Sequence, residues 1–439
     1  MVITFMVLIM ARWLLPVVAL IVVPILFAIG GGFGAAELSK MMLDGLRTIA
    51  PTGVLLMFAI LYFGVMIDAG LFDPVVRRIL AAVRGDPLRV VVGTALLALF
   101  VSLDGDGSTT YMITVAAMLP LYQRLKLGAL NLTCVTMLAS GVMNMTPWGG
   151  PLARAATALQ VDPADVFVPM LPAMAVGVLS VIGFAWILGR RERARLGALH
   201  WPDRTVAIQG AAAAREGLEA VDHLVDPGVA AIRRPNLMWA NAALTVVLMG
   251  CLIAGVLPLP VLFMIAFSIA LVLNYRSLAD QRARIVAHSG NVLAVVSVIF
   301  AAGVFTGILA GTGMVDAMSK SFLALVPPSL GPYLATITAV ASLPFTFFIS
   351  NDAFYFGVLP IVSEAAAAYG ITPVEMARAS LIGQPVHLLS PLVPSTYLLV
   401  GLAGVEFGDH QRFTIKWASL VCLLMLLTSL VCGLFPLAR

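Results

Sequence analysis

The chain has 439 residues, of which 61% are hydrophobic and only 11% are charged. Soluble globular proteins carry about 25% charged residues, so this composition excludes that class and indicates an all-α polytopic membrane protein. The net charge of +4 does not indicate a nucleic-acid partner, because loop arginines account for it. The four cysteines lie in apolar runs without metal-ligand spacing and are interpreted as small packing residues.

Nine apolar segments are long enough to span a bilayer, either whole or as broken halves. The ten residues before them, Met1–Met10, reach only about 15 Å as a helix, which is half of a bilayer core. We therefore expect a short, truncated N-terminal helix. The nine segments are 13–30, 50–72, 129–158, 167–189, 237–257, 258–275, 291–313, 373–405 and 413–434.

The positive charges fall mainly on one side of the predicted membrane. Of the 26 Lys and Arg residues, twenty face one side, four face the other, and Arg154 and Arg378 lie inside spans. Cytoplasmic loops carry an excess of Lys and Arg, so the first side is predicted to be cytoplasmic. It includes 190–236, a long polar stretch interpreted as a solvated linker. We expect a multi-pass protein of a bacterial-type cytoplasmic (inner) membrane.

The two membrane halves, 1–189 and 237–439, share three features in the same order. Each contains the spacing G-x5-G-x2-D, in "GVMIDAGLFD" from Gly64 and in "GILAGTGMVD" from Gly307. Each then has a polar interruption ("DGDGST" and "SNDAF") and a proline-bearing break ("TPWGGP" and "SPLVPST"). The charge map places the first interruption towards the cytoplasm and the second towards the outside, which is typical of the inverted repeats of secondary transporters. Chance similarity between apolar segments is the competing explanation.

The polar interruptions are predicted to be the tips of re-entrant hairpins. The arms around "DGDGST", 88–103 and 111–122, would rise about 24 Å and about 18 Å as helices, which is too short for a comfortable crossing. Basic residues assigned to one side precede and follow this pair, so the chain enters and leaves on the same side. The second hairpin is predicted to have arms 333–349 and 354–364 around "SND".

The tips carry carboxylates and hydroxyls at membrane depth. Asp104 and Asp106, and Asp352 in the second tip, offer oxygen ligands to a hard cation or a site for a proton. The glycines that follow the first two aspartates let the backbone turn and approach a ligand. The alternative is that Asp104 and Asp106 only cap the second arm, although two carboxylates with Ser108 and Thr109 exceed what a cap needs.

The proline-bearing breaks supply the other half of the predicted site. After "TPWGGP" a new half-helix begins, whose free N–H groups and dipole favour an anion. Arg154 lies one turn into it and can bind a carboxylate through two N–H groups; snorkelling to the interface is the alternative. Arg378 is interpreted as snorkelling or pairing with Glu375. His387 is interpreted as a packing residue or as a ligand or proton site, and Asp68 is a secondary candidate.

These stretches resemble the family of citrate–divalent-metal:proton symporters, often written CitMHS, in the ion-transporter superfamily. The resemblance rests on "LDGDGSTTYMIT", "PWGGPLARAAT", "SNDAFYFGVLPI" and "GQPVHLLSPLVPSTYLL". It extends over nearly the whole chain, with the short N-terminus and the central loop as its weak places. It implies two inverted repeats, each with a hairpin and a broken helix, a homodimer, and an elevator-type motion.

The resemblance also implies that the tips and breaks meet in one site. Citrate would be taken up as a complex with a divalent cation such as Mg²⁺ or Ca²⁺, coupled to protons. Chelation leaves citrate with about one negative charge, which lowers the cost of leaving water. Substrate contacts would come from Ser108, Thr109, Gly149, Gly150, Arg154, Ser350, Asn351, Ser390, Ser395 and Thr396, and metal or proton contacts from Asp104, Asp106, Asp352 and His387.

In this interpretation the divalent cation is a co-substrate, and neither a permanently bound cofactor nor an enzyme activity is expected. A sodium-coupled di- or tricarboxylate carrier of the same superfamily is the nearest alternative, although three acidic tip residues favour protons or a divalent ion. An anion extruder or a cation/proton antiporter is a further alternative. An intramembrane aspartyl protease needs two facing aspartates and is a remote alternative, because it has no use for mirrored helix breaks.

Overall fold

A computed structural model describes residues 1–11, 13–83, 86–197 and 232–439 of the chain. Within these ranges the regular structure is helical, and seven helices are long and apolar enough to cross a membrane. The prediction of an all-α polytopic membrane protein is therefore confirmed. The predicted linker 190–236 lies largely outside the described residues.

The first half begins with a nine-residue helix, at the place where a short helix is expected. The third helix is much longer than the predicted segment 50–72, because helical structure continues through the polar residues that precede it. The elements are α1 (Val2–Met10), α2 (Pro16–Gly30), α3 (Ala35–Asp68), α4 (Asp73–Val83), α5 (Pro87–Val101), η1 (Ser102–Asp104), α6 (Gly107–Arg124), α7 (Ala129–Met143), α8 (Gly150–Leu159) and α9 (Pro163–Gly197).

The second half, like the first, has two helices before a 34-residue helix. The predicted segment 373–405 is broken into three helices, and a π-helical turn follows the second tip. The elements are η2 (Pro235–Leu237), α12 (Met238–Ile253), α13 (Leu259–Asn274), α14 (Leu278–Gly311), α15 (Met314–Leu325), η3 (Gly331–Tyr333), α16 (Leu334–Phe348), η4 (Ala353–Val358), α17 (Leu359–Ala367), α18 (Pro373–Ser380), α19 (Gln384–His387), α20 (Pro394–Ala403) and α21 (Phe407–Val431).

Two short helices that hydropathy did not predict, α4 and α15, carry the aspartates of the shared glycine–aspartate spacing in their first turns: Asp73 is the first residue of α4, and Asp316 is the third residue of α15. Each follows one of the two 34-residue helices, α3 and α14. A helical hairpin then follows in each half, α5 with α6 and α16 with η4 and α17, at the places where hairpins are predicted. Each half continues with a broken helix and ends with a long one.

The helices α3 and α14 pack against each other in opposite directions. Gly45 lies against Gly307, whereas Gly64, further along α3, lies against His288, which is earlier in α14. Around this pair α2 packs on α14 and α13 packs on α3. An inverted repeat requires such an antiparallel arrangement of equivalent helices, and the repeat itself stays a prediction.

Glycines bring α3 and α14 unusually close. A Cβ atom on Gly45 would lie 2.1 Å from the carbonyl oxygen of Gly303, and one on Gly307 would lie 2.3 Å from that of Met41. Small residues allow such close approach between membrane helices. The two long helices therefore form one tightly packed unit.

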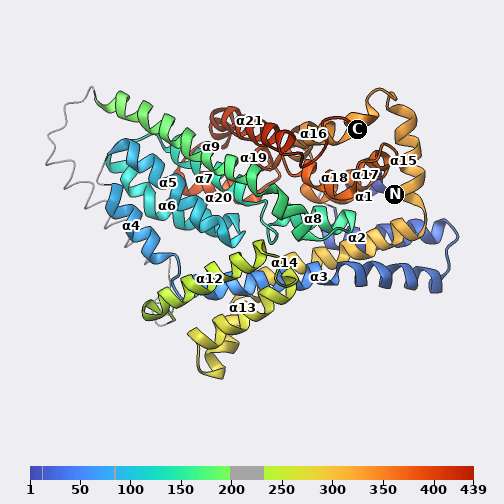
Figure 1. Cartoon of the computed structure of the whole chain (residues 1–439), viewed down its shortest axis with the longest axis horizontal. Coiled ribbons are helices and arrows are strands. Elements are labelled where there is room, and N and C mark those ends of the chain that lie inside the picture. The colour runs from blue at the N-terminus through green and yellow to red at the C-terminus, as the bar shows by residue number, and fades with distance from the viewer. Residues whose placement is uncertain (12, 84–85, 198–231) are drawn as a thin grey trace.

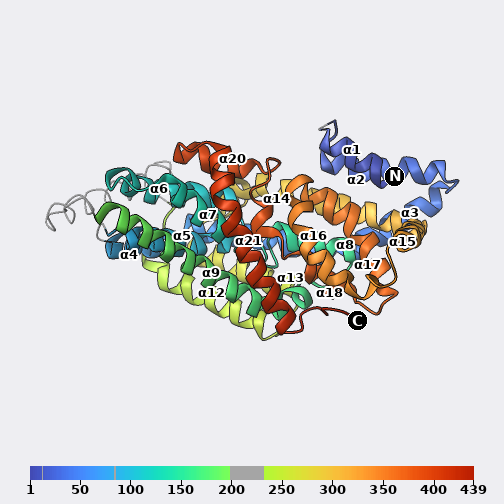
Figure 2. The same cartoon turned by 90° about the horizontal axis from the view of Figure 1, so that it is seen from above.

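The hairpins and broken helices lie on one side of this unit. Figure 1 shows α3, α12, α13 and α14 along the lower side of the molecule, with α5–α9 and α16–α21 above them. Figures 1 and 2 place α4 and α6 near one end of the long axis, and α15 and α17 near the other. Below, α1–α3 and α12–α14 are called the scaffold, and the hairpins with the broken helices and α9 and α21 are called the hairpin domain.

Candidate functional site

The first hairpin tip turns on a glycine. Gly105 has a φ of 79°, in the left-handed region that favours glycine. One carboxylate oxygen of Asp104 accepts the backbone N–H of Asp106 at 2.9 Å. The other oxygen, Oδ2, is buried without a hydrogen-bond partner among the described residues. A buried carboxylate oxygen without a partner is costly, so Asp104 is a candidate to receive a cation or a proton.

Asp106 is the N-cap of α6. Its Oδ1 accepts the N–H of Ser108 at 3.0 Å, and its Oδ2 accepts the N–H of Thr109 at 3.1 Å and the Thr109 hydroxyl at 2.6 Å. The capping interpretation therefore accounts for much of this side chain. Gly107, which was expected to assist the turn, is the first residue of α6 and does not have a positive φ.

The first break is built around two glycines with different roles. A Cβ on Gly149 would lie 2.2 Å from the carbonyl oxygen of Asn144, so only glycine fits there. A Cβ on Gly150 would lie 2.8 Å from Nη1 of Arg154, so this glycine leaves room for the guanidinium. Between Asn144 and these glycines, Pro147 removes a backbone donor and helps to end α7.

Trp148 joins the first break to the first tip and to the scaffold. Its Nε1 donates to the carbonyl oxygen of Leu103 at 2.9 Å. Its ring lies 5.2 Å from the rings of Phe63 on α3 and Phe263 on α13. A Cβ on Gly105 would approach the Trp148 ring to 2.9 Å. The aromatic cluster therefore fixes the first tip against the long helices.

The second tip faces the first half of the chain. Ser350 accepts the N–H of Ala353 at 3.2 Å through its hydroxyl, as a cap does. Asn351 lines a cavity, and its Oδ1 is buried without a partner among the described residues. Nε of Arg154 donates to Oδ1 of Asp352 at 2.6 Å. Arg154 is therefore held in an ion pair that joins the first break to the second tip.

The second break contributes His387 and Ser395. Nδ1 of His387 lies 2.7 Å from the carbonyl oxygen of Thr346, which can only accept, so Nδ1 carries a proton. Ser390 caps the turn by accepting the N–H of Leu392 at 3.2 Å, and the Thr396 hydroxyl donates to the carbonyl of Leu388.

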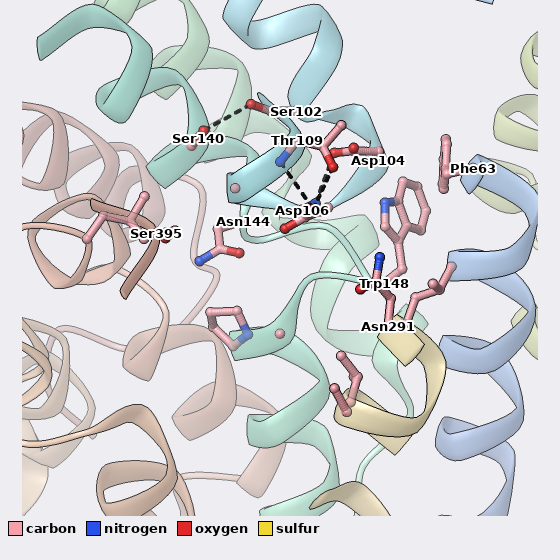
Figure 3. Close-up of a pocket in the computed structure, with 18 of the residues that line it drawn as sticks. Phe63, Ser102, Asp104, Asp106, Thr109, Ser140, Asn144, Trp148, Asn291 and Ser395 are labelled. Carbon is pink, nitrogen blue, oxygen red and sulfur yellow. Dashed lines mark hydrogen bonds between the residues drawn. The ribbon is translucent and has the colours of Figure 1, made fainter. Parts of the chain in front are cut away.

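Both tips and both breaks surround one cavity of about 450 Å³. Small-molecule sites typically measure about 300–1,000 Å³. Figure 3 shows Asp104, Asp106 and Thr109 of the first tip around this pocket, together with side chains from α3, α7, α14 and both breaks. The cavity is lined in part by Ser102, Ser140, Asn144, Trp148, Asn291 and His288.

Eight of the fourteen predicted site residues line this cavity, and six do not. Asp352 and Gly149 contact or support residues that line it, whereas four others serve mainly at helix ends or turns beside it. Those that line the cavity are Asp104, Asp106, Thr109, Gly150, Arg154, Asn351, His387 and Ser395. Those that do not are Asp352, Gly149, Ser108, Ser350, Ser390 and Thr396.

The sequence analysis missed the polar residues of helices that pack behind and opposite the tip. Ser102 at the end of the first arm and Ser140 on α7 lie 3.2 Å apart through their hydroxyls. Asn144, at the end of α7, lies two residues before the break "TPWGGP" and was given no role. Asn291 and His288 lie on α14, where polar residues inside a long apolar helix are the signal that could have found them.

The scaffold side of the cavity also carries a partly buried cluster of charged and titratable side chains. Asp68 contacts Nε2 of His288 at 2.8 Å and Nη1 of Arg284 at 3.2 Å. His288 reaches the cavity wall, so Asp68 acts behind that wall. The secondary candidate of the sequence analysis is therefore a partner of a lining residue.

The oxygen atoms around the cavity suit a cation that is already partly coordinated by another molecule. In the described ranges no group of three His, Cys, Asp or Glu side chains is placed to hold a metal ion. Carboxylate, hydroxyl and amide oxygens do face the cavity, and these are the ligands that Mg²⁺ and Ca²⁺ prefer. A chelated cation needs only a few of them.

The comparison with known families decides the assignment. The sequence model described as citrate transporter (CitMHS) matches residues 5–383. The chain belongs to this family. It is 57% identical to the citrate transporter of Bacillus subtilis (strain 168) over 99% of the chain and 97% of the relative. With the same coverage, it is 52% identical to the Mg²⁺/citrate complex secondary transporter of that organism.

Solved structures of two other transporters share the fold of this family member. One is the YdaH transporter of Alcanivorax borkumensis, at 16% identity and a TM-score of 0.53, covering 92% of this chain and 90% of that one. The other is MtrF of Neisseria gonorrhoeae, at 13% identity and a TM-score of 0.60, covering 91% and 84%. The family is one of secondary transporters and not of enzymes, so the protease alternative is rejected.

Proposed function

We propose that this chain takes up citrate as a complex with a divalent cation of the Mg²⁺ or Ca²⁺ type, coupled to protons. The observation that carries the proposal is the placement of opposite charges around one cavity. Asp104 has an unpartnered oxygen and lies on the first tip, while Arg154 from the first break lines the same space. A metal–citrate complex needs both kinds of group, an anion for its cation and a cation for its carboxylates.

In this proposal the first tip holds the cation. Asp104 supplies a charged oxygen, and Asp106, Thr109 and Asn144 supply further oxygens that line the cavity. The N-terminus of α8 and the guanidinium of Arg154 face the carboxylates of citrate. Two relatives of high identity, one named as a citrate transporter and one as a Mg²⁺/citrate complex transporter, support this substrate class.

Transport in this proposal follows an elevator motion in the inner membrane. The hairpin domain carries the site past the scaffold, which also forms a homodimer, and 190–236 lies in the cytoplasm. The close packing of α3 on α14 supports a rigid scaffold. The Phe63–Trp148 contact is one that such a motion has to break.

Uptake of radiolabelled citrate into proteoliposomes tests the proposal, with citrate, Mg²⁺, Na⁺ and the pH gradient varied separately. We expect uptake to follow the concentration of the Mg²⁺–citrate complex and to be accelerated by an inward proton gradient. We expect it to be independent of the Na⁺ concentration. Liposomes without protein are the control. Uptake that follows free citrate and a Na⁺ gradient would favour the sodium-coupled carrier, for which the Ser, Thr and Asn oxygens at the tips would be the ligands.

A further inference from the structure

In the candidate site, Arg154 is paired with an anion that belongs to the protein itself, the carboxylate of Asp352. Arg154 lies on α8 of the first half, and Asp352 precedes η4 of the second half. Their side chains are 23% and 14% exposed, and Nε lies 2.6 Å from Oδ1. Among the described residues, Asp352 is the carboxylate in ion-pair contact with Arg154.

A charged Arg154 at this depth is costly unless an anion pairs with it, because an uncompensated charge would otherwise remain inside the protein. Intramembrane arginines therefore pair with an anion. When the cavity holds no substrate, Asp352 is that anion. When a substrate carboxylate binds Arg154, it takes the position that Asp352 occupies.

We propose that Asp352 is a built-in competitor of the substrate, which neutralises Arg154 in the empty carrier and is displaced by a citrate carboxylate. This inference rests on the proposed function, in which Arg154 binds citrate. It assigns Asp352 a role different from the metal or proton contact expected from the sequence. The empty site stays electrically neutral around Arg154, so the unloaded carrier can return across the membrane.

The inference predicts that removal of the Asp352 carboxylate strengthens the binding of substrate. Asp352→Asn keeps the volume of the side chain but removes the anion, so Arg154 is free for substrate. Isothermal titration of the purified full-length protein with Mg²⁺–citrate should give a dissociation constant at least about fivefold lower than that of wild type. Glu375→Gln is the matched control: it removes a carboxylate that contacts Arg439 at 2.7 Å, and Glu375 is not among the residues that line the cavity. Its dissociation constant should not change.

Two results with Asp352→Asn would overturn the inference. An unchanged dissociation constant would make the pair a structural clamp. Weaker binding of Mg²⁺–citrate would make Asp352 a ligand of the cation. A wild-type protein that binds no Mg²⁺–citrate would instead refute the proposed function, and the inference with it.

A second readout follows from the neutrality of the empty site. In proteoliposomes, Asp352→Asn should exchange internal for external citrate at a rate near that of wild type, because the loaded carrier has no bare charge. Net uptake should fall at least about tenfold, because the empty variant carries an unpaired Arg154. Equal losses of exchange and net uptake would contradict the inference.

A measurement on the wild type keeps the inference testable if the variant does not fold. Hydrogen exchange of peptides that cover 349–358 should become faster when Mg²⁺–citrate is added, because the second tip loses its anchor on Arg154. Slower exchange in this segment would show that the substrate binds the tip instead of displacing it.

Discussion

At the scale of single residues, the two aspartates of the first tip have separate tasks. Asp106 uses both oxygens to hold the first turn of α6. Asp104 uses one oxygen for the turn and leaves the other without a partner among the described residues. Chemistry towards a ligand is therefore assigned first to Asp104 and structural capping first to Asp106.

Asp104→Asn should separate charge from structure. Asn can still accept the N–H of Asp106, so the thermal midpoint should stay within about 2 °C of wild type. Uptake of Mg²⁺–citrate should fall at least about tenfold, because the charged oxygen is lost. Asp106→Asn, which loses an acceptor for Thr109, should be less stable by about 1 kcal/mol. Wild-type uptake by Asp104→Asn would leave this carboxylate as a turn residue only.

The adjacent glycines of the first break provide a second pair of variants. In Gly150→Ala the new Cβ would lie 2.8 Å from the mobile end of Arg154, so the fold should persist and the guanidinium should move. We expect the affinity for Mg²⁺–citrate to fall about tenfold or more, as misplacement of a binding group does. In Gly149→Ala the Cβ would lie 2.2 Å from backbone. This variant should yield little folded protein in size-exclusion chromatography. If Gly149→Ala and Gly150→Ala behaved alike, the assignment of a structural role to Gly149 and a binding role to Gly150 would be wrong.

At the scale of elements, the packing of α3 on α14 requires glycine at particular positions. Gly307→Ala would place a Cβ 2.3 Å from the carbonyl of Met41. Overpacking of this kind costs about 1–3 kcal/mol, or more where backbone has to move, so we expect a lower thermal midpoint. Gly290→Ala, in the same helix and with nothing within 4 Å of its Cβ, is the control and should be neutral. Equal midpoints would mean that the two helices are not in close contact in the membrane.

The sequence predicted the hairpins and breaks because proline, glycine and aspartate interrupt apolar runs. The placement of Asp104, Arg154 and Asn351 at one site came from the resemblance to the family and not from the spacing of these interruptions. The sequence did not predict that Arg154 pairs with Asp352, because the partners are 198 residues apart and only tertiary packing joins them. His288 was missed because the apolar run was taken to begin at 291, whereas α14 begins at Leu278. Asn291 is the first residue of that predicted run but was given no role. Because the helices were predicted from hydropathy, α4 and α15 were also missed.

At the scale of the whole molecule, the charge distribution predicts orientation. Ser277 precedes α14, and Ser329 follows α15; both side chains are exposed. The first lies on the side rich in Lys and Arg. The positive-inside rule therefore predicts Ser277 to be cytoplasmic and Ser329 to be external.

Cysteine labelling in whole cells tests this orientation. The native cysteines are first replaced, because Cys432 is exposed. A membrane-impermeant maleimide should label Ser329→Cys in intact cells and Ser277→Cys only after the cells are opened. Labelling of Ser277→Cys from outside would invert the predicted orientation, and equal labelling of both would contradict the separation of these positions by the membrane.

The large sequence separation between Arg154 and Asp352 has a consequence for the synthesis and membrane insertion of the chain. A membrane protein is inserted as it is synthesised, so α8 enters the bilayer long before residue 352 leaves the ribosome. During that interval Arg154 lacks its ion-pair partner Asp352. Asp68 likewise lacks its partners Arg284 and His288. The first half must therefore stay hydrated or loosely inserted until the second half arrives. Completion of the site is then coupled to completion of synthesis, because a polypeptide stopped after α9 lacks the partners of both Arg154 and Asp68.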